Sequence, residues 1–193
     1  ASVRAHLEGL YALATAGTGD AGIFLELFSG AGRVAAALKK RNVSAVAFEL
    51  SKCYIYDLSN VHVLKVLFSW ITHGRVRCIW FGTPCQTWSI ACRPAARDLV
   101  HIWGKPDLPP HRGPAVELGN KTLSATCKLV RLCILHRVPC ILENPDTSMM
   151  FRAPPLVQLA RHSCFDLARC SMCAFGARWR KHTKMYGWHA SLD

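Results

Sequence analysis

The segment WFGTPCQTWS, residues 80–89, places a cysteine between Pro84 and Gln86 at the end of an apolar run. A cysteine thiol acts as a nucleophile when its pKa is lowered or when a neighbouring group activates it. Pro84 fixes the backbone before Cys85, and the residues that follow are polar, so this thiol need not be buried. Cys85 is therefore a candidate nucleophile, and the alternative is one more structural cysteine in a cysteine-rich chain.

A carboxylate and an amide follow a second apolar run, in the segment ILENP at residues 141–145. Glu143, at the end of a neighbouring strand, is well placed to act on the same substrate as Cys85. Taken alone, Glu143 would also fit a solvated strand end or a helix cap. The presence of Cys85 favours a catalytic role.

A glycine-rich turn with a later acid predicts a cofactor site. In FLELFSGAG, residues 24–32, Gly30 and Gly32 let a backbone approach a ligand closely, although a tight turn explains them equally well. Glu49 follows about 20 residues later, where an acid can accept hydrogen bonds from both hydroxyls of a ribose. These features predict an adenosine-containing cofactor, with Asp57 placed either to reach the adenine amino group or to cap the next helix.

These residues need a scaffold that brings strand ends together. Apolar runs predict four buried strands, at residues 22–28, 44–50, 76–82 and 138–144. Helical patterns occupy residues 3–16, 33–42, 60–74 and 117–137. Near-continuous hydrophobic strands separated by helices are typical of a parallel sheet covered on both faces. We therefore expect a doubly wound, mostly parallel α/β fold, in which ligands bind beyond the carboxyl ends of the strands.

The length of 193 residues fits one domain, residues 1–193, with an N-terminal helix and loop over residues 1–20. Residues 92–116 form a long loop rich in Pro and Arg, which we interpret as a mobile active-site loop or a disordered insertion. No apolar run reaches the roughly 18 to 20 residues of a membrane-spanning helix. The N-terminus lacks a secretory pattern, and its first residue, alanine, suggests a fragment or a processed product.

The charge balance predicts a polyanionic partner. Lys plus Arg number 24 and Asp plus Glu number 12, which gives a net charge of +12. Such a balance most often indicates nucleic acid, although a basic protein without such a partner has the same composition. Many of the cations lie in predicted loops, namely Arg93, Arg97, Lys105, Arg112, Arg178, Arg180, Lys181 and Lys184.

The ten cysteines indicate a reducing compartment. Several lie inside apolar patterns, where a free cysteine packs like a small hydrophobic residue, and this favours an intracellular protein, nuclear in a eukaryote, over a disulfide framework. We expect no metal. The alternative is structural zinc held by His162, Cys164, Cys170 and Cys173, because the last two have ligand spacing.

The motifs FLELFSGAG, FGTPCQTWS and ILENP, in this order, resemble those of the cytosine-5 DNA methyltransferase family. FGARWRKHTKMYG, residues 175–187, is similar to a later segment of that family, in which a glutamine and arginines follow Phe-Gly. The resemblance spans about residues 23–187. It implies a Rossmann-like class I methyltransferase fold, S-adenosylmethionine as cofactor and DNA as substrate, favoured over RNA.

The resemblance also implies a role for each matching residue. Cys85 would attack carbon 6 of a cytosine so that carbon 5 accepts the methyl group, and Glu143 would hydrogen-bond or protonate N3. Asn144 would orient the site, and Arg180, with Arg178, would support the base or Glu143. The cofactor would be held by Phe28, Ser29, Gly30, Gly32, Glu49, Asp57 and Pro84. From the charge pattern and not from the resemblance, we expect the nucleic acid to be bound by Gln86, Arg93, Arg97, Arg112 and Lys181.

The sequence departs from the family pattern at several points. Pro145 replaces a usual valine, Trp179 stands where glutamine is expected, and Lys181 stands where an arginine often lies. The family's target-recognition region is absent, so we expect a recognition domain or partner to be supplied elsewhere. This shortened form resembles, less closely, the methyltransferase-like domains of retroelement polyproteins. Two alternatives stay open: the same chemistry on RNA, and a non-catalytic nucleic-acid-binding module.

Overall fold

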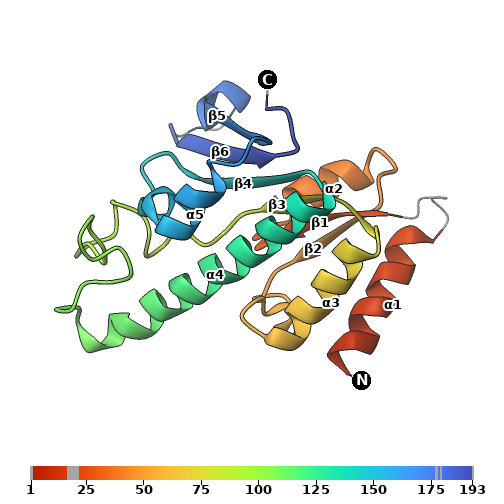
Figure 1. Ribbon diagram of the computed structural model, residues 1–193, viewed down its shortest axis with the longest axis horizontal. Coiled ribbons are helices and arrows are strands. Elements are labelled where there is room, and N and C mark those ends of the chain that lie inside the picture. Colours follow the sequence, from red (N-terminus) through yellow and green to blue (C-terminus); the bar gives the residue numbers. More distant parts are fainter. Residues whose placement is uncertain (1, 17–21, 177, 179, 193) are drawn as a thin grey trace.

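The computed structural model describes residues 2–16, 22–176, 178 and 180–192. Six strands form a sheet in the order β2-β1-β3-β4-β6-β5 (Figure 1). Their bounds are β1 (Ile23–Leu27), β2 (Ala45–Phe48), β3 (Val76–Phe81), β4 (Cys140–Pro145), β5 (Phe165–Ser171) and β6 (His182–Trp188). Strands β1 to β4 run parallel, whereas β6 is antiparallel to both of its neighbours. The protein therefore has an α/β fold with a mixed, mostly parallel sheet.

Helices flank this sheet (Figure 1). They are α1 (Val3–Thr15), α2 (Arg33–Lys39), α3 (Val61–Thr72), α4 (Gly113–His136) and α5 (Pro154–Leu159), with short 3₁₀ turns η1 (Tyr54–Tyr56), η2 (Pro110–Arg112), η3 (Met149–Arg152) and η4 (Met172–Phe175). Helices α1, α3 and α4 pack side by side, whereas α2 packs on β1 and β2. Across residues 2–16, 22–176, 178 and 180–192, no helix has the length and apolar character needed to cross a membrane.

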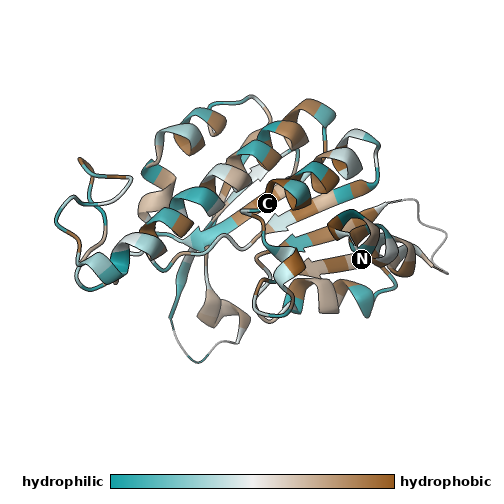
Figure 2. Cartoon of the chain, turned by 90° about the horizontal axis from the view of Figure 1, so that it is seen from below, coloured by the Kyte–Doolittle hydropathy of each residue, from teal (hydrophilic) through white to brown (hydrophobic). Residues whose placement is uncertain are grey.

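The core lies between the sheet and the layer of α1, α3 and α4. Leu25 and Leu27 of β1, Phe81 of β3 and Trp70 of α3 are completely buried there. Glu26 leaves β1 on the opposite face and accepts a hydrogen bond from the backbone N–H of Ala35 in α2 at 2.7 Å. In Figure 2 the sheet contains both hydrophobic (brown) and hydrophilic (teal) stretches. Strands β1 and β2 are mostly apolar and buried, as strands covered on both faces require. The prediction of an α/β fold with a mostly parallel sheet is confirmed.

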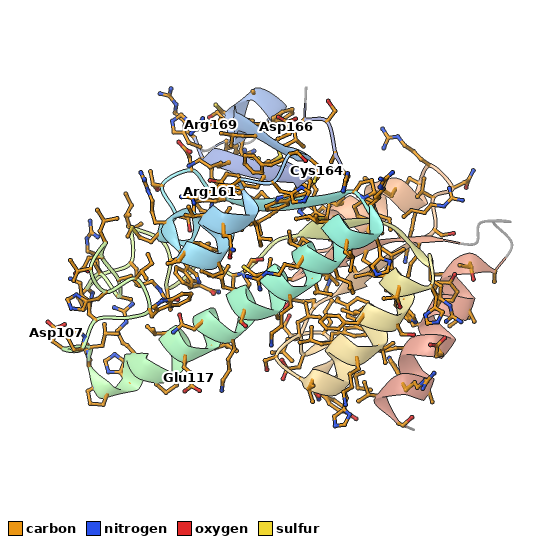
Figure 3. The ribbon with its side chains drawn as sticks, viewed as in Figure 1. Asp107, Glu117, Arg161, Cys164, Asp166 and Arg169 are labelled. Carbon is orange, nitrogen blue, oxygen red and sulfur yellow. The ribbon has the colours of Figure 1, made fainter. Side chains whose placement is uncertain are left out.

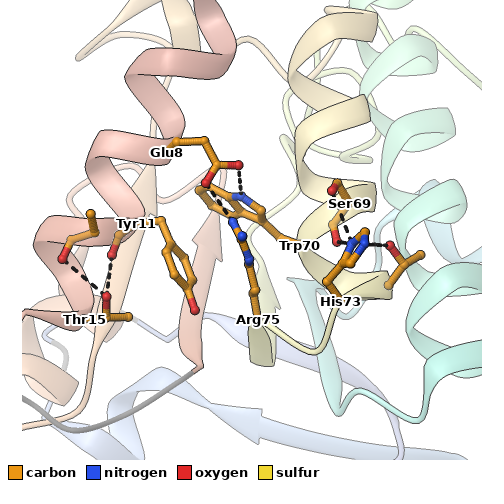
Figure 4. A network of polar contacts seen from close by, with 9 residues as sticks. Glu8, Tyr11, Thr15, Ser69, Trp70, His73 and Arg75 are labelled. Carbon is orange, nitrogen blue, oxygen red and sulfur yellow. Dashed lines mark hydrogen bonds and ion pairs between the residues drawn. The ribbon is translucent and has the colours of Figure 1, made fainter.

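A polar network at the edge of this core fixes α1 to α3 (Figure 4). The Glu8 carboxylate accepts hydrogen bonds from the indole N–H of Trp70 at 3.2 Å and from the guanidinium of Arg75 at 2.7 Å. The Tyr11 ring packs against Trp70 with 5.4 Å between centroids. Burial acts to raise the pKa of Glu8, but the hydrogen bonds from Trp70 and Arg75 outweigh it and hold this pKa below its ordinary value.

The elements differ from the predicted ones in part. The four predicted strands match within two residues at either end. Helix α4 begins at Gly113 rather than at residue 117, because Pro114 suits the first turn of a helix, and the loop predicted over residues 92–116 is shorter as a result. Strands β5 and β6 were not predicted. The predicted loop over residues 17–20 lies outside the described residues.

Candidate active site

A cleft of about 760 Å³ opens at the carboxyl ends of β1, β3 and β4. Its volume is in the range of small-molecule sites, about 300 to 1,000 Å³. Parallel strands place their carboxyl ends at one edge of a sheet, so residues distant in sequence meet there. The predicted site residues that line the cleft are Phe28, Gly30, Glu49, Asp57, Pro84, Cys85, Gln86, Glu143, Asn144 and Lys181.

The turn after β1 forms one wall of the cleft. Phe28, Gly30 and Gly32 have φ angles of 56°, 52° and 70°, a region that glycine adopts without strain. A Cβ at Gly82 would lie 2.8 Å from the carbonyl oxygen of Phe28, so the ends of β1 and β3 approach too closely for any side chain there. Gly30 borders the cleft, whereas Ser29 and Gly32 lie behind this wall, and Gly32 caps the start of α2.

Glu49, directly after β2, ties this turn to the neighbouring strand. Its Oε2 accepts a hydrogen bond from the backbone N–H of Gly30 at 2.6 Å. Its Oε1 accepts bonds from the backbone N–H and the hydroxyl of Ser51, at 3.3 Å and 3.2 Å. Each carboxylate oxygen has two lone pairs. The carboxylate therefore holds the turn, and Oε2 keeps one acceptor position for a hydroxyl group of a ligand in the cleft.

Asp57 lines the cleft but does not cap α3. Its Oδ1 accepts bonds from the backbone N–H and the hydroxyl of Ser59, at 2.8 Å and 2.7 Å. The cap of α3 is Asn60, whose side chain accepts a bond from the N–H of His62 at 2.9 Å. The helix-capping alternative for Asp57 is thus wrong, because the chain makes one more turn before the helix begins. The position beside a ligand remains open to this carboxylate.

Cys85 begins a turn at the opposite wall of the cleft. Its carbonyl oxygen accepts bonds from the backbone N–H of Trp88 at 2.9 Å and of Ser89 at 2.8 Å. The residue is half-buried and lines the cleft beside the exposed Gln86. By contrast, burial raises the pKa of Cys127, in the core, to about 11. The thiol of Cys85 is accessible from the cleft, unlike a core cysteine.

Glu143 and Asn144 reach the cleft from the end of β4. Glu143 Oε1 accepts a bond from the Lys181 ammonium at 3.0 Å, and the two side chains are 17% and 38% exposed. The Asn144 amide is buried and donates to the carbonyl oxygen of Thr83 at 2.7 Å. Its Oδ1 has no hydrogen-bond partner among the described residues. Since an unpaired buried acceptor is costly, this oxygen is a candidate contact for a ligand.

The hairpin between β5 and β6, together with the start of β6, borders the cleft on the Glu143 side. We call residues 172–184 the hairpin rim. The resemblance implies that Arg180, with Arg178, contacts the base or Glu143. The structure instead pairs Glu143 with Lys181, and both arginines are exposed. The reason is the register: β6 begins at His182, and the backbone N–H of Asp146 bonds to the His182 carbonyl, which carries Lys181 to the end of β4.

The segment from Cys85 to α4 borders the cleft on the other side. We call residues 85–112 the loop rim. In Figure 3, Asp107 of the loop rim and Arg169 of β5 lie on well-separated parts of the molecule. The prediction that Arg97 contacts nucleic acid is wrong here, because Arg97 is only 4% exposed and its guanidinium is bound to protein acceptors.

The other predicted cations of the loop rim differ in exposure. Arg112 is half-buried and donates to the Pro94 carbonyl at 2.9 Å, with a second contact to the Cys92 sulfur. Arg93 is exposed and donates to the carbonyl of Cys92 at 3.3 Å. Arg93 is therefore the more available of the two for an external anion.

The zinc alternative is not supported. His162 Nδ1 lies 3.1 Å from Cys164 Sγ, but Cys170 is six positions further along β5, a separation of about 20 Å in an extended strand. Cys173 follows β5 in η4. Within residues 2–16, 22–176, 178 and 180–192, no three His, Cys, Asp or Glu residues come close enough together to hold a metal ion.

Two parts of the site were missed by the sequence reasoning. The first is the apolar lining, contributed by Phe48, Leu50, Tyr56, Leu58, Ala115 and Leu118. The clustering of apolar residues on both sides of Glu49 was a usable signal for it. The second is Asp146, next to Pro145, which pairs with Lys184 at 3.0 Å and Arg169 at 3.1 Å. No local pattern indicated this pair of contacts, because they depend on strands β5 and β6.

Comparison with known proteins adds no family assignment. No protein-family model matches the chain, and no curated protein sequence matches it significantly. The function is therefore inferred from the residues of the cleft and from the motifs that carry them.

Proposed function

We propose that this protein transfers a methyl group from S-adenosylmethionine to carbon 5 of cytosine in DNA, as its resemblance to the cytosine-5 DNA methyltransferase family implies. The observation that carries this proposal is the shared cleft, which Cys85, Glu143 and Asn144 line together with Glu49. A nucleophile and a carboxyl group from separate strand ends are the groups that covalent activation of a pyrimidine needs, and an acceptor for ribose hydroxyls is what the cofactor needs.

The residues of the cleft fit S-adenosylmethionine. Glu49 has one acceptor position left on Oε2 for a ribose hydroxyl, and Phe28, Tyr56 and Leu58 offer apolar surface to an adenine ring. Asp57 offers a carboxylate on the same wall for the adenine amino group. When bound, the cofactor supplies a methyl group activated by a sulfonium sulfur. Its product after transfer is S-adenosylhomocysteine.

The sheet supports the finer fold assignment that goes with this proposal. The parallel order β2-β1-β3-β4, with a glycine turn after β1 and an acid after β2, is compatible with a doubly wound, Rossmann-like class I methyltransferase fold. In such sheets ligands bind outside the carboxyl ends of the strands, and the cleft lies at that edge.

Cys85 acts as the nucleophile. Its thiolate sulfur forms a bond to carbon 6 of the cytosine, and the displaced electron pair moves toward carbon 5. Carbon 5 then takes the methyl group. Loss of the carbon 5 proton to solvent returns an electron pair to the ring, which breaks the bond between sulfur and carbon 6 and releases Cys85 as a thiolate. The chain ends the cycle unchanged.

Glu143 holds the other end of the cytosine ring. In its protonated form it donates a hydrogen bond to N3, or transfers its proton there, while negative charge develops during attack by Cys85. Lys181 fixes the Glu143 carboxylate through the 3.0 Å contact. Asn144, held by its bond to Thr83, presents Oδ1 as an acceptor at the same edge. These residues orient the base before the chemical step, which lowers the entropic part of the barrier.

The nucleic acid is held by exposed cations on both rims. Arg93 on the loop rim, and Arg178 and Arg180 on the hairpin rim, are exposed, and Lys181 and Gln86 line the cleft between the rims. Cations so placed bind phosphates without regard to sequence. The reacting face of cytosine is hidden in a duplex, so the base must be flipped out or presented in single-stranded form.

The first test of this proposal is cofactor binding, because it needs no knowledge of the target. Isothermal titration calorimetry should give a Kd of about 1 to 100 μM for S-adenosylmethionine and S-adenosylhomocysteine, weakened at least about tenfold in Glu49→Ala. Glu117→Ala, on the exposed surface of α4, is the matched control. If neither S-adenosylmethionine nor S-adenosylhomocysteine binds, the proposal is wrong.

The second test is covalent trapping. Oligonucleotides that contain 5-fluorocytosine should form a stable adduct with wild-type protein in the presence of S-adenosylmethionine, because the fluorine blocks release of Cys85. Paired DNA and RNA oligonucleotides of the same sequence decide between the two substrates. A protein that binds the cofactor but traps neither would be a binding module rather than an enzyme.

A further inference from the structure

Arg97 is the most completely bound cation of the loop rim. Guanidinium has five N–H donors, and each of them has an acceptor here. Nε donates to the carbonyl of Thr87 at 3.0 Å; one terminal nitrogen donates to the Ile102 carbonyl and to Asn120 Oδ1, both at 2.8 Å. The other terminal nitrogen donates to Thr87 Oγ1 and to the Val116 carbonyl, both at 3.1 Å. Arg97 thus joins the turn after Cys85 to helix α4.

The surroundings of Arg97 are shaped to accept it. The guanidinium carbon lies 3.5 Å from the centroid of the Trp88 ring, which is fully buried. Helix α4 has a glycine at the contact: a Cβ at Gly119 would lie 2.5 Å from Thr87 Oγ1 and 3.0 Å from an Arg97 nitrogen. Burial lowers the pKa of Arg97 to about 10, so the group remains protonated at neutral pH.

The same turn is held from the side of Glu143 as well. The carbonyl of Trp88 accepts a bond from the backbone N–H of Met149 at 2.8 Å, and Met149 begins the 3₁₀ turn that follows β4. The turn that starts at Cys85 is therefore held between Arg97 on one side and the segment after Glu143 on the other. Thr87 and Trp88 lie two and three residues beyond Cys85, so a shift of either moves the thiol.

We propose that Arg97 is a positioning residue that fixes Cys85 in its attacking geometry. Gly119 has no side chain and so leaves a notch in the surface of α4, which Thr87 and Arg97 occupy. This inference rests on the proposed function, and it gives Arg97 a role different from the phosphate contact that the loop charges predicted. Arg97 acts through Thr87 and Trp88 and contacts no substrate.

Two variants test this proposal, each with a matched control. Arg97→Lys keeps the charge but loses the planar five-donor group, and its control is Arg41→Lys, an exposed arginine at the end of α2. Gly119→Ala keeps Arg97 but fills the notch. Its control is Gly113→Ala in the same helix, where a Cβ would meet nothing within 4 Å. Thermal unfolding establishes whether each variant is folded. If Arg97→Lys does not fold, the measurements on Gly119→Ala test the proposal.

The first readout does not depend on the methyltransferase activity. Alkylation of Cys85 by iodoacetamide, followed by mass spectrometry of the Cys85 peptide, reports how the thiol is presented. We expect the rate at Cys85 to rise at least about threefold in Arg97→Lys and Gly119→Ala as the turn loosens, and to stay at the wild-type value in both controls. An unchanged rate in a folded variant would overturn the proposal.

The second readout is the chemical step. The rate of adduct formation with 5-fluorocytosine DNA, and kcat for methyl transfer, should fall about 10- to 100-fold in both variants, because a displacement of about 1 Å has that effect. The Kd for S-adenosylmethionine should stay within about twofold, because Glu49 and Asp57 lie on the other wall. A kcat within about twofold of wild type would overturn the proposal. Wild-type protein that forms no adduct would overturn the proposed function instead, and the alkylation rates would still decide the role of Arg97.

Discussion

The two rims of the cleft are both rich in basic residues, yet they are held in different ways. The loop rim is fixed by one buried guanidinium, Arg97, whose five donors are all bound to protein acceptors. The hairpin rim is fixed by ion pairs at the surface, such as Lys181 with Glu143 and Lys184 with Asp146, both at 3.0 Å. Its arginines, Arg178 and Arg180, face solvent.

This difference separates two uses of positive charge. A buried cation with all its donors satisfied positions backbone, and salt screens it little. Exposed cations are free to contact phosphates, and their contribution to stability is small and sensitive to salt. We expect the buried Arg97 of the loop rim to determine geometry, and the exposed cations, most of them on the hairpin rim, to bind the nucleic acid. Four predictions, from the largest effect to the smallest, test this division.

Loss of the Cys85 thiol should abolish catalysis. In Cys85→Ala we expect methyl transfer to fall by at least about 10⁴-fold and covalent trapping to disappear, because no bond to carbon 6 can form. The affinity for S-adenosylmethionine should not change. The matched control is Cys173→Ala, which removes the exposed thiol of the hairpin rim and should leave the methylation rate unchanged. Equal rates in wild type and Cys85→Ala would refute the nucleophilic role of Cys85.

Removal of Arg97 should destabilise the fold far more than removal of Arg180. Arg97→Ala leaves several buried acceptors, among them the carbonyls of Thr87 and Val116, without a donor, and we expect a loss of about 3 kcal/mol in the free energy of unfolding. Arg180→Ala, at an exposed position, should change it by less than about 0.5 kcal/mol. Urea unfolding measures both, and similar values for the two would contradict the comparison.

Loss of Lys181 should affect catalysis without much effect on stability. In Lys181→Met the Glu143 carboxylate loses its fixed partner, and we expect kcat to fall about 10- to 100-fold. The free energy of unfolding should change by less than about 1 kcal/mol, because the pair is partly exposed. Arg178→Met is the control on the same rim and should weaken DNA binding with little change in kcat. If kcat is unchanged in Lys181→Met, the Glu143 carboxylate does not depend on the contact with Lys181 for catalysis.

The smallest effect concerns Asp146 and acid. The hydrogen bond from Lys184, followed by that from Arg169, holds the pKa of Asp146 below its ordinary value of 3.8. A carboxylate with a lowered pKa contributes stability above its ordinary pKa and loses that contribution as the pH falls through the lowered value. Wild type should therefore exceed Asp146→Asn by under about 1 kcal/mol at pH 7.

This difference should vanish at acidic pH and shrink in high salt, as urea unfolding at several pH values and salt concentrations can measure. The loss of stability in Arg97→Ala should be insensitive to salt, because that site is buried. If the contribution of Asp146 to the free energy of unfolding does not change with salt, then the hairpin rim is held by buried contacts, as the loop rim is.

The parallel half of the fold was predictable because its strands are hydrophobic on both faces. Runs such as GIFLELF and VRCIWF allow little besides buried strands, and once four such strands are parallel their carboxyl ends must converge. This is why Glu49, Cys85 and Glu143 were expected at one edge before any coordinates. Strands β5 and β6 were missed because FDLARCS and HTKMYGW mix exposed charges with apolar residues. They show neither the alternation of a half-buried strand nor the spacing of a helix clearly.

The role of Arg97 could not be predicted, because it depends on packing between distant segments. Its acceptors include Asn120 and Val116, about 20 residues away on α4, and nothing local distinguishes Arg97 from the exposed Arg93. The loop composition indicated cations at the surface, and the tertiary structure overrides that expectation. The start of α4 was predicted four residues too late, at residue 117, although Pro114 in the first turn is a local signal that could have located it.

Strand β4 has a consequence for how this site tolerates change. Glu143 and Asn144 are neighbours on a strand, so they leave it in opposite directions, and β6 fixes their pairing through Met185 and Lys184. Deleting or inserting one residue between Pro139 and Glu143 would exchange which of the two side chains points to which face. Substitutions elsewhere in β4 change one contact at a time, whereas a change of length by one residue would disrupt the carboxylate, the amide and the hairpin rim together.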